Sequence, residues 1–345
     1  MSNIVITPQW VGTFEKAQRT LIQNAWDRVN KNLVWDKFME VRPSSTLTEL
    51  YMWLLETAQI HDEDQGGQKS FDSIAATFFE ITNKNSGSAL KLTRNEIEDN
   101  MLARPGMTQG GPALDYAANW ARQIGGASAY WPQEKMFDLI KAGEGTTLGT
   151  AYDALAFFSK VHPVNKFDSS KGTYANLLSG SSSGIYPGAC PIDITNATTL
   201  SEAASNFAAA VAYIESLTQP NGKPRYLKVK YALAGQDLKK RLHEILSTKY
   251  FGQDGSTENV LTSYGIEPVT APELTTAGEY YLACEQLTAE GGALIFQDRS
   301  PYVLTSYTPE TQAQLQLRKE FVWSYDGRNA ASYGHPYLLF KVKPA

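Results

Sequence analysis

The sequence predicts an α+β fold, because it contains both helical and strand-like patterns and mixes the two over residues 224–300. Long helical patterns cover residues 12–32, 113–142 and 200–217. Strand-like patterns rich in aromatic residues cover residues 47–83 and the C-terminal stretch from Tyr302. The 345 residues allow one large domain or two closely associated ones, and the hydrophobic fraction of 42% is ordinary for a globular core.

The first helical pattern lies near the N-terminus. Residues 12–32 carry apolar side chains at steps of three or four, the spacing of one helical stripe. These side chains are Phe14, Ala17, Leu21, Ala25 and Val29. We expect an N-terminal amphipathic arm.

Residues 47–83 are expected to form a long hairpin with a polar tip at residues 61–69. Its arms carry large apolar side chains, namely Tyr51, Trp53, Phe71, Phe78 and Phe79. Two strands cannot bury this surface, because an isolated hairpin has no core. The hairpin therefore packs either on its own domain or over a neighbouring subunit.

A short strand and two helices are expected next. Residues 89–92 have a strand pattern, and Thr93 with Glu96 forms a capping box that begins a helix ending before Pro105. The pattern over residues 113–142 predicts a long helix, which Pro132 can kink or divide.

The second half of the chain mixes connectors, helices and strands. Residues 163–195 are rich in Ser, Gly and Pro and are expected to form a connector without a core. An Ala-rich helix at 200–217 is followed by a strand at 225–233, a helix at 235–248 and an apolar run at 291–300. The last segment alternates like strands, and Asp326-Gly327 within it is a tight-turn signal.

Charge and cysteine usage exclude several classes of protein. The net charge is −5 and no block of Lys and Arg follows a phosphate backbone, so tight DNA binding is not expected. Cys190 and Cys284 stand far apart, which indicates neither a disulfide framework nor a zinc site. Residues 1–10 lack a signal-peptide pattern, and no apolar run approaches the roughly 18 residues of a membrane span. We expect a soluble protein of the reducing cytoplasm.

Catalytic signals are weak throughout the sequence. The string at residues 180–184 matches GxSxG with Ser182 in the nucleophile position, but Pro187 and Pro191 follow, where that motif requires a helix. The four histidines have no metal-ligand spacing, residues 61–64 do not match a calcium loop, and residues 143–149 are not a phosphate-binding loop. We predict no catalytic, cofactor-binding or metal-binding residues.

Three segments together resemble the major head subunit (gpT type) of phage Mu and its prophage relatives, a family with the Hong Kong 97-type capsid fold. The first runs from LTELYMWLLETAQI through FDSIAATFFEITNK to ALKLTRNEIEDN, and the third is LRKEFVWSYDGRNAASYGHPYLLFKV. The second contains the most recognisable string, which consists of Tyr152-Asp153, Phe157-Phe158-Ser159 and His162-Pro163. The matches keep the family's order over residues 40–345. This chain has Ala154 where the family string usually has Gly, and residues 240–290 match loosely.

The resemblance implies a division of the chain into five regions. These are an N-terminal arm (1–46), an extended loop formed by the β-hairpin (47–90), a peripheral domain with a long spine helix and a β-sheet (91–214), an axial domain (215–290) and the return strands of the peripheral domain (291–345). In this fold the extended loop lies across an adjacent subunit. That position accounts for the apolar side chains that the hairpin cannot bury by itself.

The implied function is that of the major capsid protein of a tailed phage or Mu-like prophage. Such a subunit is no enzyme and assembles with itself into the hexamers and pentamers of an icosahedral head around double-stranded DNA. The implied partners are a scaffolding protein, a maturation protease, a portal and a decoration protein, with assembly in the host cytoplasm, no membrane and no sequence-specific DNA contact. Crosslinking through Lys69 has no identified partner residue. Three alternatives stay open: an encapsulin-like bacterial shell, a tail or baseplate protein, and a serine hydrolase using Ser182.

Overall fold

The computed structural model describes residues 6, 8–54, 76–102, 112–179, 194–251, 257–286, 291–309 and 312–344. The helices are α1 (Pro8–Asn30), α2 (Arg94–Leu102), α3 (Pro112–Ala142), α4 (Leu200–Glu215), α5 (Lys239–Ser247) and α6 (Ala313–Arg318). Short 3-10 turns are η1 (Trp35–Lys37), η2 (Ser169–Lys171), η3 (Val260–Ser263) and η4 (Pro336–Leu338). The hairpin tip, the string at 180–184 and Cys190 lie outside the described residues.

The strands form two main sheets and three small pairs. The first sheet has the order β1 (Met39–Pro43), β13 (Leu294–Tyr307), β14 (Glu320–Tyr333), β4 (Lys84–Thr93). The second has the order β11 (Glu267–Thr270), β8 (Leu227–Ala234), β12 (Tyr280–Gln286), β15 (Leu339–Lys343), β7 (Leu177–Ser179). The pairs are β2 (Thr48–Leu54) with β3 (Ala76–Thr82), β5 (His162–Pro163) with β6 (Thr173–Tyr174), and β9 (Tyr250–Phe251) with β10 (Thr257–Glu258).

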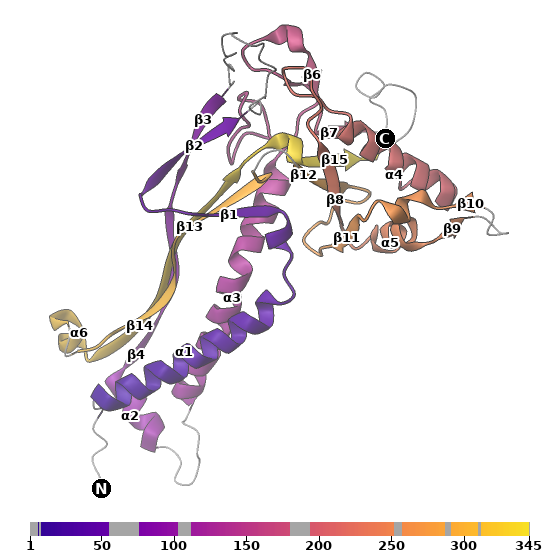
Figure 1. The fold of residues 1–345 in the computed structure, drawn as a ribbon. Helices are drawn as coiled ribbons and strands as arrows, with labels where there is room; N and C mark the ends of the chain where they lie inside the picture. Colours follow the sequence, from indigo (N-terminus) through magenta and orange to yellow (C-terminus); the bar gives the residue numbers. More distant parts are fainter. Residues whose placement is uncertain are drawn as a thin grey trace, which may run out of the picture.

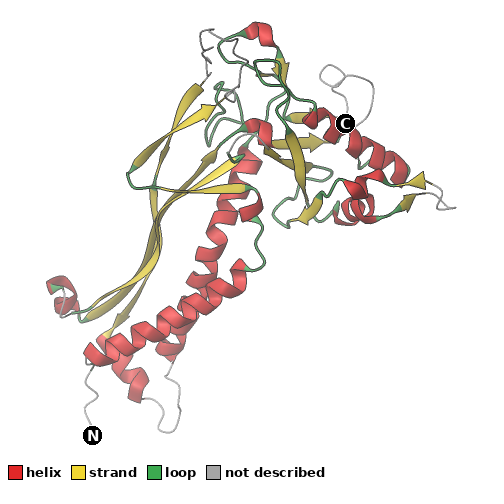
Figure 2. Ribbon diagram, in the orientation of Figure 1, coloured by secondary structure: helices red, strands yellow, loops and turns green. Residues whose placement is uncertain are grey.

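The first sheet forms an elongated unit with α1 and α3 (Figure 1). The two helices pack along each other beside the long strands β13 and β14 (Figure 2). Gly125 of α3 makes this close crossing possible, because a Cβ there would lie 2.3 Å from the carbonyl oxygen of Ile22 in α1. A hydrophobic cluster that includes Ile22, Ala121 and Trp323 fills the space between the helices and the sheet.

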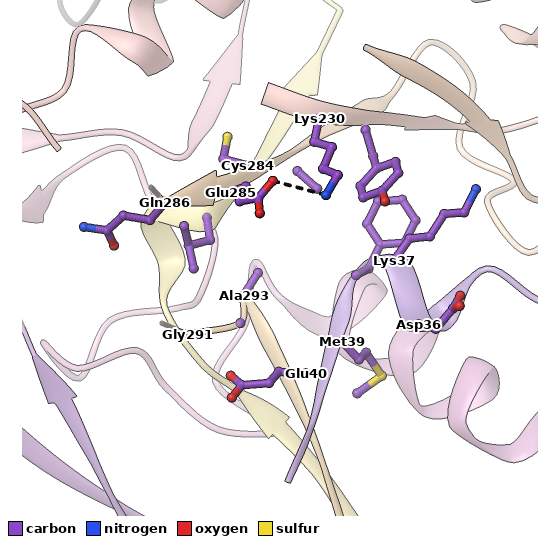
Figure 3. A pocket seen from close by; sticks show the side chains of 15 residues that line it. Asp36, Lys37, Met39, Glu40, Lys230, Cys284, Glu285, Gln286, Gly291 and Ala293 are labelled. Atoms are coloured by element: carbon purple, nitrogen blue, oxygen red, sulfur yellow. Dashed lines mark hydrogen bonds and ion pairs between the residues drawn. The ribbon is translucent and has the colours of Figure 1, made fainter. Parts of the chain in front are cut away.

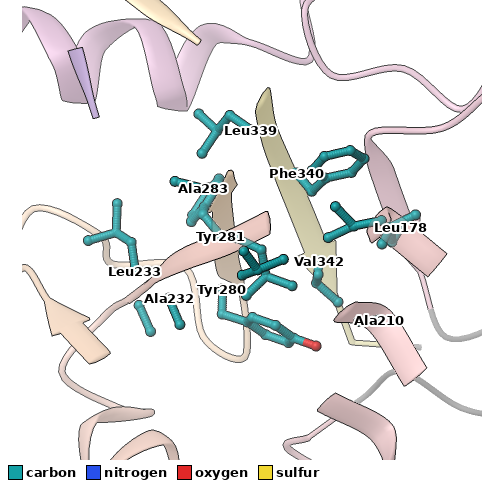
Figure 4. Packing of buried hydrophobic residues seen from close by; sticks show 14 of the residues in the cluster. Leu178, Ala210, Ala232, Leu233, Tyr280, Tyr281, Ala283, Leu339, Phe340 and Val342 are labelled. Carbon is teal, nitrogen blue, oxygen red and sulfur yellow. The ribbon is translucent and has the colours of Figure 1, made fainter. Parts of the chain in front are cut away.

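The second sheet and helices α4 and α5 form a more compact unit (Figure 1). Its core is the larger hydrophobic cluster, in which Tyr280 of β12 and Val342 of β15 face residues of α4 such as Ala210 (Figure 4). The last turns of α3, including Phe137, belong to the same cluster. The two units therefore share one continuous core at this end of the spine helix.

Most expected helices and strands are confirmed. α1, α3, α4 and α5 occupy the predicted stretches, and the arms β2 and β3 pair antiparallel. The capping box is present, since the amide of Thr93 donates to Glu96 at 2.7 Å and the amide of Glu96 donates to the Thr93 hydroxyl at 3.3 Å.

Pro132 does not divide α3, which runs without a break from residue 112 to 142. Contacts on both sides of the proline hold the helix where one backbone hydrogen bond is lost. Trp131 donates to Asn329 at 2.9 Å, and Gln133 donates to Glu273 at 2.7 Å.

Two expectations from local sequence are wrong. Asp326-Gly327 forms no turn but lies inside β14, which is paired on both sides by β13 and β4. The glycine is required because the ring of Tyr302 covers it, and a Cβ would lie 2.9 Å from that ring. The predicted connector at 163–195 also contributes to the core, since it contains β7 and the buried residues Tyr174 and Asn176.

Candidate assembly surfaces

The β2–β3 hairpin has an inner face that packs on its own subunit. Tyr51 stacks on Phe79 at 5.4 Å between ring centroids, and its hydroxyl donates to the buried Gln297 of β13 at 2.8 Å. Arg42 lies over the ring of Tyr51 at 5.1 Å, and Ile81 is buried. These contacts hold the described stem against the first sheet.

The base of the hairpin is fixed by a carboxylate clasp. Glu49 accepts hydrogen bonds from the amides of Thr46 and Ser45 at 2.9 and 2.8 Å and from the hydroxyl of Ser44 at 3.0 Å. These bonds, those from Thr46 and Ser45 first, lower the pKa of Glu49 to about 2. Asn83 closes the clasp by donating to Ser44 at 2.8 Å. The direction in which the hairpin projects is therefore set at its base.

The outer face of the hairpin is apolar and exposed. Leu50, Met52 and Phe78 are 62%, 46% and 62% exposed, and Met52 lies directly opposite Phe78 in the strand register. Side chains on one face of a strand pair belong to a single surface, so these three form a contiguous patch, the outer hairpin face. A soluble subunit gains nothing from exposing such a patch, which is typical of a protein–protein contact. The sequence located the aromatic hairpin but did not say which face is free.

The string at residues 152–163 folds into a buried knot. His162 Nδ1 lies 2.7 Å from Oδ2 of Asp153, and both side chains are almost fully buried. Asn176 donates to the carbonyls of Phe157 at 2.7 Å and Pro336 at 3.0 Å. The knot therefore joins this segment to the end of the chain. Its histidine and aspartate contribute to structure within a closed network.

Ala154, inside the knot, has a φ of +67°. This left-handed conformation is unfavourable for residues with a Cβ and natural for glycine. The geometry explains why the family string has Gly at this position.

A partly buried cluster of ion pairs joins the segment after α3 to the second sheet. Lys341 of β15, only 4% exposed, lies 2.8 Å from Glu144 and 2.7 Å from Glu279. Lys343 lies 2.6 Å from Glu144. Burial acts to raise the pKa of Glu144, but the hydrogen bonds from the two lysines outweigh it and lower that pKa. Sequence reasoning missed this cluster, because its members are up to 199 residues apart and carry no local signal.

A cavity of about 510 Å³ lies between the two units (Figure 3). The segment η1–β1 contributes Lys37 and Glu40, and strands β8 and β12 contribute Lys230, Cys284 and Glu285. Lys230 and Glu285 form an ion pair at 3.1 Å. Burial raises the pKa of the Cys284 thiol, which disfavours the reactive thiolate. The lining residues therefore offer no activated nucleophile.

Other residues weighed in the sequence are separated in the structure. His243 is exposed on α5, and His335 is buried against Tyr337, with 5.0 Å between ring centroids. In the described ranges, no group of three or more His, Cys, Asp and Glu side chains could hold a metal ion. Ser182 and Lys69 lie outside those ranges, so the prediction that the chain has no catalytic residues stays a prediction. None of the described helices has the length and apolar character needed to cross a membrane.

Comparison with protein families gives one match. The sequence profile of the family described as Mu-like prophage major head subunit gpT matches residues 11–187, just over half of the chain. A search among curated proteins found no match.

Comparison with solved structures gives phage capsids. The capsid of the cyanophage P-SCSP1u has a chain that is 12% identical, with a TM-score of 0.51, and the likeness covers 90% of this chain and 88% of that one. The procapsid of bacteriophage JBD30 has a chain that is 18% identical, with a TM-score of 0.48, covering 97% of this chain and 75% of that one. The likeness to the cyanophage capsid shows a shared fold.

Proposed function

The chain belongs to the Mu-like prophage major head subunit gpT family, and from this premise we propose that its outer hairpin face is buried on a neighbouring subunit when the head assembles. The chain is a major capsid protein of the tailed-phage type with the Hong Kong 97-type fold. It is a structural component of the virion and no enzyme, and it assembles with copies of itself into a shell.

The outer hairpin face is the observation that carries this proposal. Phe78, at 62% exposure, and Met52, at 46%, project from strands whose opposite face is already packed on the first sheet. The clasp at Glu49 fixes the base, so the apolar surface is held ready for a partner at little further entropic cost. Because this subunit assembles with itself, a second copy of the chain is always available as the partner.

We further assign the two units to domains of the fold. The first sheet with α1 and α3 is the peripheral domain, and β2–β3 is the extended loop. The second sheet with α4 and α5 is the axial domain. Its helix α4 and its strands β7 and β15 lie almost wholly outside residues 215–290, so we extend the axial domain to include them.

The finer assembly scheme is also a proposal. Hexamers and pentamers of this subunit form an icosahedral head around double-stranded DNA, with a scaffolding protein, a maturation protease, a portal and a decoration protein as partners. Assembly takes place in the host cytoplasm. The net charge of −5 supports a wall that encloses DNA without binding particular sequences.

The proposal is tested by electron microscopy and light scattering of Phe78→Asp, prepared alone and with a scaffolding protein. We expect a folded subunit with unchanged circular dichroism that forms no closed shells, because a charge would have to be buried at the contact. Val260→Asp is the matched control, since it adds the same charge in place of an equally exposed apolar side chain (62%) in η3, away from the hairpin. Normal shells from Phe78→Asp would contradict the proposed burial.

The alternatives make different predictions. A tail or baseplate protein would form rings or tubes instead of closed shells. An encapsulin-like shell would contain a protein cargo and no DNA, which analysis of purified particles decides. A hydrolase would react with a serine-directed probe and lose that reaction in Ser182→Ala. Family membership favours none of these alternatives.

A further inference from the structure

Arg225 is a buried cation that has no acidic partner in the described part of the chain. It lies shortly before β8, and its side chain is among the largest that are fully buried, with 2% exposure. No carboxylate of the described residues forms an ion pair with its guanidinium. A buried charge is strongly unfavourable unless another group of opposite charge or several hydrogen bonds compensate it.

The contacts that Arg225 makes compensate its charge only in part. Nε donates to the carbonyl of Thr218 at 3.0 Å, and the guanidinium lies over the ring of Tyr337, with 4.3 Å from Cζ to the ring centroid. The carbonyl end of α4, shortly before Thr218, contributes at most about half a negative charge. Nη2 is buried and has no hydrogen-bond partner among the described residues. One strong donor and part of the positive charge are therefore left over.

A second buried donor lies near this guanidinium. Tyr174 of β6 is 3% exposed, and its hydroxyl also has no hydrogen-bond partner among the described residues. Burial, followed by the neighbouring Tyr152, raises the pKa of Tyr174 well above its usual value, and the charge of Arg225 acts against that rise. The hydroxyl therefore stays protonated, so it can donate a hydrogen bond close to a positive charge.

The surrounding side chains come from three separate parts of the chain. Arg225, Tyr152, Tyr174 and Tyr337 are each at most 3% exposed, and we call these four residues the arginine–tyrosine cluster. The acidic residue next to it in sequence, Asp153, is already bound to His162 at 2.7 Å. The cluster therefore joins the buried knot to the loop before β8 and to η4, and it contains one cation and no free carboxylate.

We propose that the arginine–tyrosine cluster binds one small monovalent anion of the halide class, such as chloride, between Nη2 of Arg225 and the hydroxyl of Tyr174. Both groups are donors, and hydrogen bonds from donors to an ion are stronger than those between neutral groups. One uncompensated cation matches one negative charge, whereas phosphate or sulfate would bring about two charges into a site with a single arginine. A water molecule would accept from the two donors but would leave the charge of Arg225 uncompensated.

The test is urea unfolding of the unassembled subunit over a range of chloride concentrations, with the ionic strength kept constant by gluconate. Because a ligand that binds only the folded chain stabilises it by mass action, we expect each tenfold rise in chloride above the Kd to lower the unfolding equilibrium constant by about tenfold. This corresponds to a limiting slope of about one in a double logarithmic plot, the value for a single site.

Two variants and one control assign the effect to the cluster. Tyr174→Phe removes the hydroxyl and keeps the ring, so we expect it to raise the chloride concentration at half-saturation by about tenfold or more. Arg225→Gln removes the charge and should abolish the chloride dependence. Tyr213→Phe is the matched control, because its buried hydroxyl accepts from the amide of Ala175 at 2.9 Å. It should lower stability and leave the chloride dependence unchanged.

Crystals grown with bromide in place of chloride locate the ion directly. We expect an anomalous scattering peak between Arg225 and Tyr174 in the unmodified chain and a weaker one in Tyr174→Phe. Peaks on surface side chains alone would show adventitious ions only and would overturn the proposal. A carboxylate of the chain itself bound to Arg225 in these crystals would also overturn it.

The unfolding data can refute the site as well. An unfolding constant that does not change with chloride would show that the protein alone compensates Arg225. The same chloride dependence in Tyr174→Phe as in the unmodified chain would place the anion elsewhere. General salt effects on unfolding are shared by Tyr174→Phe and Tyr213→Phe, so the difference between these two variants decides even if Arg225→Gln does not fold.

Discussion

His335 should make the free subunit lose stability in mild acid. The imidazole is 7% exposed and its Nδ1 has no hydrogen-bond partner among the described residues. Burial, followed by the positive charges of Arg42 and Arg225, lowers its pKa from 6.5 to about 3. The folded chain therefore keeps this histidine neutral at a pH where the unfolded chain protonates it.

The sign and size of the effect follow from proton linkage. Below pH 6.5 the unfolded chain binds more protons at this position, so the free energy of unfolding falls as the pH falls, down to about pH 3. At pH 5 the loss relative to neutral pH is about 2 kcal/mol, since the unfolded histidine is then almost fully protonated. The interval between pH 5 and pH 7 lies above the range in which most carboxylates titrate.

The measurement is urea unfolding of the unassembled subunit at pH 7 and pH 5. We expect His335→Gln to lose about 2 kcal/mol less than the unmodified chain between the two pH values, whatever its stability at pH 7. His243→Gln is the matched control, because it makes the same substitution at an exposed histidine on α5. Equal acid losses in His335→Gln and the unmodified chain would refute the argument.

Two further predictions concern positions at which a Cβ atom decides the local stability. Gly125→Ala should destabilise the subunit by about 2 kcal/mol or more, because the new Cβ would lie 2.3 Å from the Ile22 carbonyl oxygen and force α1 away from α3. Gly126→Ala should instead raise stability by up to about 1 kcal/mol, because the nearest atom to its Cβ would be in Val29, at 3.4 Å. Equal effects of the two substitutions in thermal unfolding would contradict this account of the crossing. Ala154→Gly should stabilise the chain by roughly 0.5–1 kcal/mol by relieving a φ of +67°, and a lower unfolding midpoint would show that Ala154 is not strained.

Features set by neighbouring residues could be predicted from the sequence. The capping box at Thr93 depends on a spacing of three residues and is present in the structure. The predicted N-terminal helix is also present as α1, but its stripe is only partly confirmed, because Ala25 is buried whereas Ala17 is exposed. The resemblance also identified the family, because the order of three segments carries more information than any one of them.

Features set by distant residues could not be predicted. Asp326-Gly327 has the composition of a turn, but Tyr302 covers the glycine and two strands pair with this segment, so the tertiary contacts decide. The burial of Asn176 likewise depends on carbonyls at Phe157 and Pro336, on either side of it in sequence. Neither the pairing of the Asp326-Gly327 segment nor the burial of Asn176 can be read from the residues next to it in sequence.

The two kinds of feature also differ in what they contribute to the head. The string at 152–163, the most recognisable part of the sequence, closes on itself through Asp153 and His162 and leaves side chains such as Leu155, Lys160 and Val161 exposed. Its polar core holds a conformation, and a buried network of this kind tolerates little change because each lost partner leaves an unsatisfied group. The outer hairpin face needs only apolar area and a fixed direction, which many residues provide. The most recognisable string of this chain therefore holds a conformation, whereas the exposed face of the hairpin is found only once the fold shows which side chains stay exposed.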